Sequence, residues 1–126
     1  MTPERYADIS QLMEAYFHGL HHADSNTLRG VFDVRLTYVG ATAGDETHLD
    51  LEAYMAVIDA REAPASLGDV LDADVLEITA PNDRMAHVTA RIAMLGREYL
   101  DFLTLVRAEA GWRIISKVFT YTERKT

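Results

Sequence analysis

Residues 99–121 read YLDFLTLVRAEAGWRIISKVFTY, two long apolar runs joined by a turn. The runs 99–107 and 112–121 are rich in β-branched and aromatic residues, which is typical of strands, and a short turn joins them as an antiparallel hairpin. Gly111 accepts the positive φ that a tight turn requires, and Trp112 then closes one edge of the core. This stretch predicts the end of a sheet.

Two more runs of the same kind, 70–79 and 85–95, precede this hairpin. Short turns separate all four runs, so we expect a four-stranded antiparallel meander. Both alternating positions are apolar over 92–95 and 102–106, which indicates that both sheet faces are covered. Helices can cover one face, and we expect a second copy to cover the other in a homodimer formed through the sheet. The alternative is that these residues reflect strand propensity alone.

The first half of the chain favours helices. Thr2 and Pro3 place a cap residue and an N1 proline before a helix whose apolar residues recur at a spacing of three and four. These residues are Ile9, Leu12, Met13, Tyr16, Phe17 and Leu20. Asp24 or Ser25 can cap a second, shorter helix.

A short strand and a third helix should follow. Residues 36–39 predict the strand, and Gly40–Gly44 predict a loop after it. The third helix should begin near Thr47 or Asp50, and Pro64 forbids its continuation. Helices therefore come first and the long strands later.

The composition is that of one globular domain over residues 1–126. The chain has no cysteine, which excludes disulfides, thiolate metal sites and cysteine nucleophiles. Its formal net charge of -8 makes nucleic acid a poor partner, because phosphate binding needs clustered Lys and Arg. We see no signal peptide and no run of membrane-spanning length, so we expect a cytoplasmic protein with no membrane partner.

The order of helices and strands resembles the NTF2-like superfamily over nearly the whole chain. Residues 16–20, YFHGL, with 28–32 resemble the opening of these domains, and 101–105 with 111–119 resemble the putative lumazine-binding branch, close to the SnoaL-like proteins. This resemblance implies an α+β, cystatin-like cone, in which three N-terminal helices pack on a curved antiparallel sheet around an internal pocket. The family includes enzymes, ligand-binding proteins and assembly factors, so the fold alone does not choose a function. The name of the branch implies a pterin-like or flavin-like ligand.

Asp101 is the candidate catalytic residue, because it lies among apolar residues in a strand expected near the centre of the sheet. A carboxyl group in a cavity can act as a general acid or base. Lys117 lies on the next strand and could form an ion pair with Asp101, provided that the turn sets the required register. Two interpretations stay open: a purely structural pair, or contact of either residue with a ligand.

Aromatic residues are the candidates for the wall of a pocket. Tyr16, Tyr38, Tyr54, Phe119 and Tyr121 would give an apolar surface with a few hydroxyl groups, which suits a small ligand. At helical spacing, Tyr16 and Tyr54 are also consistent with plain core residues.

The histidines do not predict a metal site. His18 and His22 are four residues apart, but they lie off the apolar helix face and lack a third ligand, so we expect exposed residues. His87 is a possible proton carrier on a strand face that the sequence leaves undecided. Arg61 and the acidic residues of the third helix should form a solvated polar face.

We predict from these features a protein that binds a small apolar or aromatic ligand in the cone pocket, with no cofactor. One alternative is a SnoaL-like cyclase or isomerase with Asp101 as general base, and another is a dimeric protein-interaction module. In the isomerase pattern the base lies at the end of the first strand, where this chain has Val39 or Gly40. That position argues against an isomerase of this type, although Tyr16 matches the place of the donor tyrosine.

Overall fold

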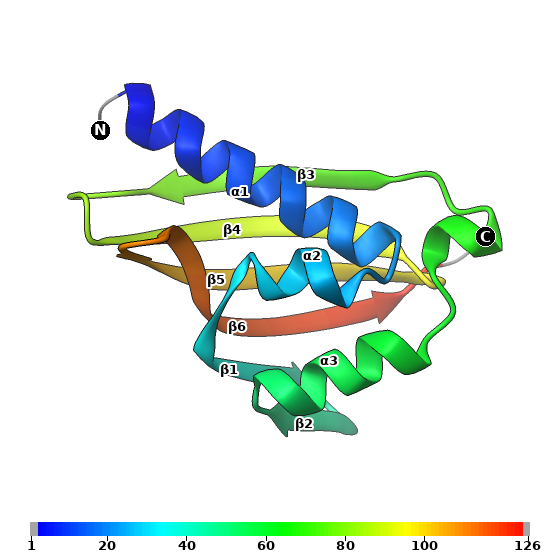
Figure 1. The fold of residues 1–126 in the computed structure, drawn as a ribbon. Helices are drawn as coiled ribbons and strands as arrows, with labels where there is room; N and C mark the ends of the chain where they lie inside the picture. The colour runs from blue at the N-terminus through cyan, green and yellow to red at the C-terminus, as the bar shows by residue number, and fades with distance from the viewer. Residues whose placement is uncertain (1–2, 125–126) are drawn as a thin grey trace.

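The computed structural model describes residues 3–124, and Figure 1 shows its helices lying across one face of a curved sheet. The elements in chain order are α1 (Pro3–His21), α2 (Ser25–Arg29), β1 (Phe32–Thr42), β2 (Asp45–Leu49), α3 (Leu51–Ala60), the 3-10 helix η1 (Pro64–Leu67), β3 (Asp72–Thr79), β4 (Met85–Met94), β5 (Arg97–Ala108) and β6 (Gly111–Glu123). Within this part of the chain, no helix combines the length and apolar character needed to cross a membrane.

The sheet has six strands in the order β2-β1-β6-β5-β4-β3. The predicted meander is confirmed, because β3 to β6 pair antiparallel in sequence order. The prediction of a wholly antiparallel sheet is wrong, because β1 pairs parallel with β6, with Tyr38 opposite Lys117. The return from the helices to the sheet therefore places β1 beside the last strand.

The predicted loop at Gly40–Gly44 is wrong. Strand β1 continues to Thr42, and a tight turn with Gly44 at a φ of +83° leads directly into β2. Thr47 belongs to β2, whereas Asp50 caps α3 by accepting a hydrogen bond from the Ala53 amide at 2.9 Å. The sequence of β2, DETHL, lacks the apolar alternation that marks a strand, so its pairing partner determines its conformation.

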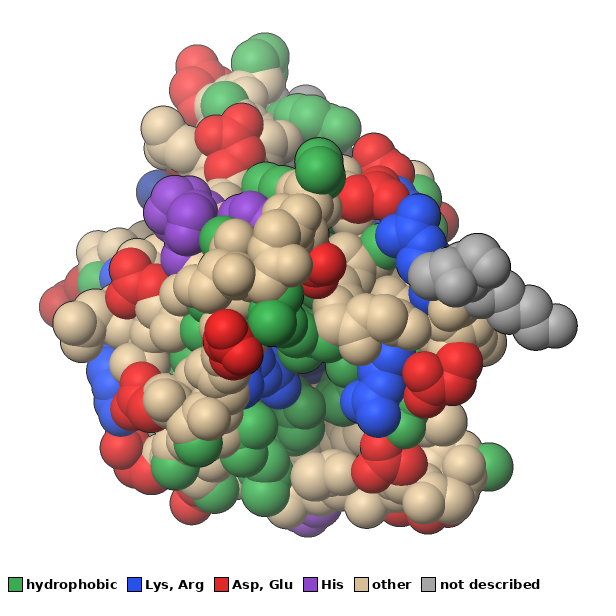
Figure 2. All heavy atoms as spheres, turned by 90° about the vertical axis from the view of Figure 1, so that its right-hand side faces the viewer, with side chains coloured by type: hydrophobic (Ala, Val, Ile, Leu, Met, Phe, Trp, Pro, Cys, Tyr) green, Lys and Arg blue, Asp and Glu red, His purple; other side chains and the backbone are tan. Residues whose placement is uncertain are grey.

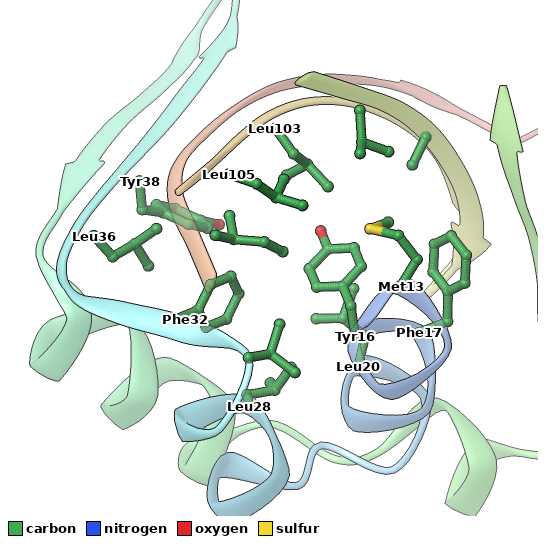
Figure 3. Packing of buried hydrophobic residues seen from close by; sticks show 14 of the residues in the cluster. Met13, Tyr16, Phe17, Leu20, Leu28, Phe32, Leu36, Tyr38, Leu103 and Leu105 are labelled. Atoms are coloured by element: carbon green, nitrogen blue, oxygen red, sulfur yellow. The ribbon is translucent and has the colours of Figure 1, made fainter. Parts of the chain in front are cut away.

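The helices bury one face against the concave side of the sheet. Figure 3 shows Tyr16 of α1 pointing towards Leu105 of β5, with Met13 and then Phe17 beside it under the sheet. Asp24 caps α2 by accepting from the Thr27 amide at 3.2 Å, as predicted, whereas the predicted cap Thr2 lies outside the described residues. The core therefore fills the space between α1 and the middle strands.

The hairpin between β5 and β6 forms as the sequence predicts. Gly111 has a φ of +109°, and Trp112 is buried behind it. This turn lies at the end of the sheet opposite to the β4–β5 turn, where Gly96 has a φ of +74°. The two ends of the cone are therefore distinct, and one of them is closed by apolar packing.

Gly19 allows α1 and α2 to approach closely. A Cβ atom at this position would lie 2.6 Å from Cδ2 of Leu28, which is fully buried. Gly19→Ala should gain about 1 kcal/mol in helix propensity but lose about 1–3 kcal/mol through overpacking. We therefore expect a net loss of about 1 kcal/mol, measured by urea unfolding. In the Leu28→Ala background the same substitution should be stabilising, and a loss of equal size in both backgrounds would contradict the contact.

Candidate functional site

A cavity of about 90 Å³ opens at the end of the cone that carries the β4–β5 turn. Figure 2 looks onto this end of the molecule, where hydrophobic and basic side chains lie recessed below the surrounding surface. Its aromatic lining consists of Tyr38, Tyr54, Tyr99, Phe119 and Tyr121. Its charged residues are Asp45, Arg61, Arg97 and Lys117.

Lys117 reaches the cavity from β6 and is only 4% exposed. Its Nζ lies 5.1 to 5.5 Å from the ring centres of Tyr16, Tyr38, Tyr54 and Phe119, a distance at which an ammonium group is attracted to aromatic faces. The same Nζ donates a hydrogen bond to the Tyr54 hydroxyl at 3.1 Å. Aromatic rings and one phenol therefore surround this amine.

Asp101 lies deeper and does not line the cavity. It is fully buried on β5, and its Oδ2 accepts a hydrogen bond from the Tyr16 hydroxyl at 2.5 Å, whereas its Oδ1 has no hydrogen-bond partner. The Tyr16 hydroxyl belongs to α1, so this bond connects the helix layer to the sheet. Of the residues predicted to line the pocket, Asp101 and Tyr16 do not line this cavity, whereas Tyr38, Tyr54, Lys117 and Phe119 do.

The predicted ion pair between Asp101 and Lys117 is wrong. The register places Asp101 opposite Phe119 and Lys117 opposite Leu103, so the two charges share the inner face but are offset by two residues along the strand. No ion pair joins these two side chains, and each bonds a tyrosine hydroxyl instead.

The tyrosines of this region favour their neutral form. Burial, and then the nearby Asp101 carboxylate, raise the pKa of Tyr16 well above its ordinary value. Burial raises the pKa of Tyr38 to about 12 and also raises the pKa of Tyr54. The positive charge of Lys117 opposes the increase for Tyr38, and that of Arg61 opposes both increases. At neutral pH these phenols therefore act as hydrogen-bonding groups without charge.

Arg61 is a residue whose role the sequence did not indicate. We predicted a solvated polar face for it, and this is wrong, because Arg61 caps the C-terminal end of α3 and lines the cavity. The neighbouring Asp59 and Glu62 are exposed, as expected. The informative signal is the position of Arg61 in the sequence: it lies three residues before Pro64, which a continuing helix could not include, and it directly follows Ala60, the last residue of α3.

Polar contacts organise the rim of the cavity. The Tyr121 hydroxyl donates to the Asp45 carboxylate, which comes from the unpredicted strand β2. The Arg97 guanidinium lies 4.0 Å from the ring centre of Tyr121, 3.5 Å from the Glu123 carboxylate and 3.3 Å from the Tyr99 hydroxyl. These contacts occupy Asp45 and Arg97 and hold β2 against the end of β6.

The histidines lie away from this cavity. His18, on α1, and His22, directly after this helix, are exposed with their rings 4.4 Å apart, and His21 lies beside them. His87 is on the outer face of the sheet, with Nε2 3.3 Å from the Thr89 hydroxyl. Between residues 3 and 124, no group of three potential His, Cys, Asp or Glu ligands is arranged to hold a metal ion.

Other hollows of the surface are larger but lack these features. One of about 390 Å³ lies between α1 and the β5–β6 turn, and another of about 610 Å³ lies beside the β4–β5 turn. Neither has a buried charged residue or a group of aromatic rings in its lining. The smaller cavity at the open end of the cone is therefore the candidate binding site.

Comparison with known proteins agrees with this architecture. Residues 4–120 match the model of a family described as "Putative lumazine-binding". No curated protein sequence matches the chain significantly.

Solved structures give the same result. The chain is similar to an NTF2-like protein of unknown function from Silicibacter pomeroyi, with 25% identity, a TM-score of 0.83 and coverage of 97% of this chain and 100% of that one. An NTF2-like protein of unknown function from Shewanella baltica gives 22% identity, a TM-score of 0.84 and coverage of 97% and 98%. A ketosteroid isomerase-like protein from Erwinia carotovora gives 12% identity, a TM-score of 0.75 and coverage of 97% of this chain and 99% of that one. The last two share the fold alone.

The buried tyrosines predict a loss of stability at high pH. Tyr16, Tyr38 and Tyr54 ionise near pH ~10 in the unfolded chain but remain protonated to higher pH when folded. Above this pH the unfolded state binds fewer protons, so the free energy of unfolding should fall by about 1.4 kcal/mol per pH unit for each tyrosine. Urea unfolding between about pH 9 and 11.5 measures this slope. Tyr16→Phe should make the slope less steep by one tyrosine's share, and an unchanged slope would contradict the assignment.

Proposed function

Because the chain belongs to the putative lumazine-binding family of NTF2-like proteins, we propose that it binds a small aromatic ligand in the cavity at the open end of the cone. The aromatic lining around a buried lysine is the observation that carries this proposal. The rings of Tyr38 and Tyr54 lie 4.1 Å apart, and those of Tyr38 and Phe119 lie 5.0 Å apart, so they form one continuous aromatic wall. Such a wall can pack against a flat ligand, and the phenol groups can orient it.

The size of the cavity limits the ligand. Its volume of about 90 Å³ is below the usual range for small-molecule pockets, about 300–1,000 Å³. A ligand would therefore be small, or would insert one end and leave the rest between Arg61 and the rim. A pterin-like or flavin-like molecule would have to bind in the second way.

The burial of Asp101 favours binding over catalysis. A general base must reach the proton that it removes, directly or through one water molecule. Asp101 is 0% exposed, lies outside the cavity lining, and has one oxygen engaged by Tyr16. A cyclase or isomerase with this residue as its base would need the interior to open.

The binding proposal can be tested by blocking the cavity. Thr47 lines it from β2, so Thr47→Trp should fill the opening, whereas His48→Trp places the same side chain on the opposite side of the strand. A thermal-shift screen with small aromatic compounds, pterins and flavins should give stabilisation of about 2.7 kcal/mol at about one hundred times the dissociation constant.

Thr47→Trp should abolish the shift, and His48→Trp should retain it. Equal shifts in both variants would place binding elsewhere. No shift with any compound in the folded protein would favour the interaction-module alternative.

We propose further that a second copy of the chain covers the outer face of the sheet. Leu100, Phe102 and Val118 form an exposed apolar patch at the centre of this face, and Phe102 is 52% exposed. At the β3 side of the same face, Arg91 pairs with Asp72, Asp74 and Glu98.

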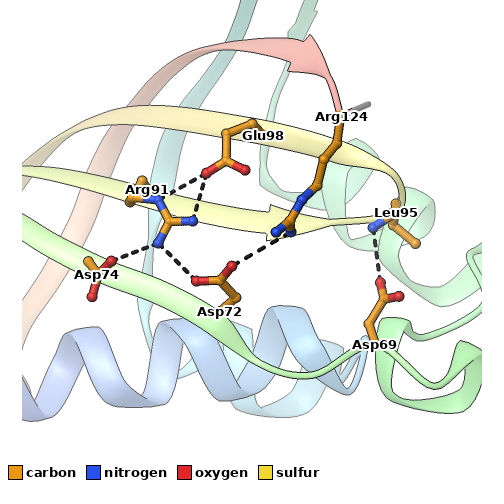
Figure 4. Close-up of polar contacts among 7 residues, drawn as sticks. All are labelled: Asp69, Asp72, Asp74, Arg91, Leu95, Glu98 and Arg124. Atoms are coloured by element: carbon orange, nitrogen blue, oxygen red, sulfur yellow. Dashed lines mark hydrogen bonds and ion pairs between the residues drawn. The ribbon is translucent and has the colours of Figure 1, made fainter. Parts of the chain in front are cut away.

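Figure 4 shows this charged group, in which a single guanidinium contacts three carboxylates. The carboxylates are thus partly neutralised within one molecule, which reduces the repulsion between two acidic copies that approach through the patch. An identical apolar surface on each copy suits a symmetric interface.

Phe102→Lys should therefore convert a dimer into a monomer, because it places two like charges at the centre of the interface. Sedimentation equilibrium of the wild type and the variant measures the change. Leu76→Lys is the matched control, because Leu76 is 54% exposed on β3, outside the patch. A monomeric wild type, or an unchanged dimer in Phe102→Lys, would contradict the proposal.

A further inference from the structure

We infer that the ligand of this cavity is a small aromatic carboxylate, whose anionic group binds Lys117 at the inner end and whose ring lies towards the opening. This inference rests on the binding function proposed above and adds the chemical class of the ligand. Four observations support it: the charge around the cavity, the unused donors of Lys117, the position of Arg61 and the aromatic wall.

The cavity has the opposite charge character to the rest of the protein. The chain carries a formal net charge of -8, yet three of the four charged residues that line the cavity are basic, namely Arg61, Arg97 and Lys117. The one lining carboxylate, Asp45, accepts a hydrogen bond from Tyr121 at the rim. An anion that enters the cavity therefore leaves a predominantly acidic surface for a local basic region.

Lys117 offers hydrogen-bond donors that the protein does not use. An ammonium group has three N–H donors, and the described structure gives Nζ one acceptor, the Tyr54 hydroxyl. No carboxylate lies within ion-pair distance of Nζ among residues 3–124. Asp101 shares the interior: its Oδ2 accepts from Tyr16 and its Oδ1 has no hydrogen-bond partner, but neither oxygen forms an ion pair with Nζ. Because buried charges are normally paired, a ligand carboxylate is the fitting partner for this amine.

Arg61 supplies a second positive charge close to the same place. Arg61 lines the same cavity as Lys117, Tyr38 and Tyr54, so the guanidinium adds to the positive charge of this site. The part of the chain that the structure describes gives Arg61 no ion pair. Arg61 can therefore attract the anion to the opening or bind one of its oxygens.

The aromatic wall distinguishes an organic carboxylate from an inorganic anion. Tyr38, Tyr54 and Phe119 offer ring faces and edges to whatever adjoins the charged group. A phosphate ion would use Lys117 but would gain no packing energy from these rings. A planar carboxylate uses both the charge and the rings, and the small volume admits its anionic end first.

The test compares benzoate, benzamide and benzylammonium, three probes of similar shape with charges of -1, 0 and +1. Binding is followed by amide chemical shifts of Lys117, Tyr54 and their neighbours, at low and at high salt. Benzoate should bind at least about tenfold more tightly than benzamide, the ratio that one charge-assisted hydrogen bond supplies, and this preference should decrease with salt. Inorganic phosphate should compete weakly.

The outcomes separate this inference from the proposed function. Equal binding of benzoate and benzamide in the cavity would leave small-molecule binding intact and overturn the carboxylate assignment. Preference for benzylammonium would overturn it in favour of a cationic ligand, and competition by phosphate at equal strength would overturn it in favour of an inorganic anion. Binding of none of the three probes at this cavity would overturn the carboxylate assignment, whereas the screen that includes pterins and flavins tests the proposed function separately.

Two variants give a second test. Lys117→Met keeps the length of the side chain, and an apolar residue of similar volume is often tolerated at a buried charged position. This variant should reduce the ratio of the benzoate affinity to the benzamide affinity to about one, because the charged donor is lost. Arg84→Gln is the control for net charge, since Arg84 is exposed and does not line the cavity. An unchanged ratio in Lys117→Met would overturn the role of this residue, and the probe series on the wild-type protein remains decisive if the variant does not fold.

Discussion

The hydrogen bond from the Tyr16 hydroxyl to the Asp101 carboxylate joins the helix layer to the centre of the sheet. Both side chains are fully buried, so neither can exchange its partner for solvent without a large part of the core opening. The bond ties α1 to β5, and Met13, Phe17 and Leu20 of the same helix belong to the buried core with Tyr16. A single polar contact inside an apolar layer thus provides specificity that hydrophobic packing alone does not provide.

The same bond determines what remains available to the cavity. Because Tyr16 engages Asp101, the carboxylate does not pair with Lys117, although both side chains point to the inner face of the hairpin. Lys117 then lies among rings and one phenol, at the boundary between the apolar core and the opening of the cone. Because the two charges are separate, Asp101 stabilises the core through its bond to Tyr16, and Lys117 keeps N–H donors that no protein group accepts from.

Most of the fold is determined by local sequence patterns. The periodicity of α1 and the alternation of the long strands depend on each residue's own neighbours, so the helix, the meander and the Gly111 turn could be predicted. Strand β2 could not, because its polar sequence becomes extended only through pairing with β1. Missing β2 also meant missing Asp45 and Thr47 in the cavity lining.

The error over Asp101 and Lys117 has a different origin. The burial of Asp101 followed from the strand pattern, but the face that Lys117 shares with it depends on the bulge between Thr104 and Leu105, which shifts the register by one residue. Asp101 bonds Tyr16 of α1 and Lys117 bonds Tyr54 of α3, in place of a bond between the two charges. A sheet of this family can therefore preserve its pattern of strands while the helices decide which polar group faces the opening. In this chain that group is the amine of Lys117. Two tyrosines, Tyr16 and Tyr54, therefore determine which charge can contact a ligand, whereas the fold alone does not.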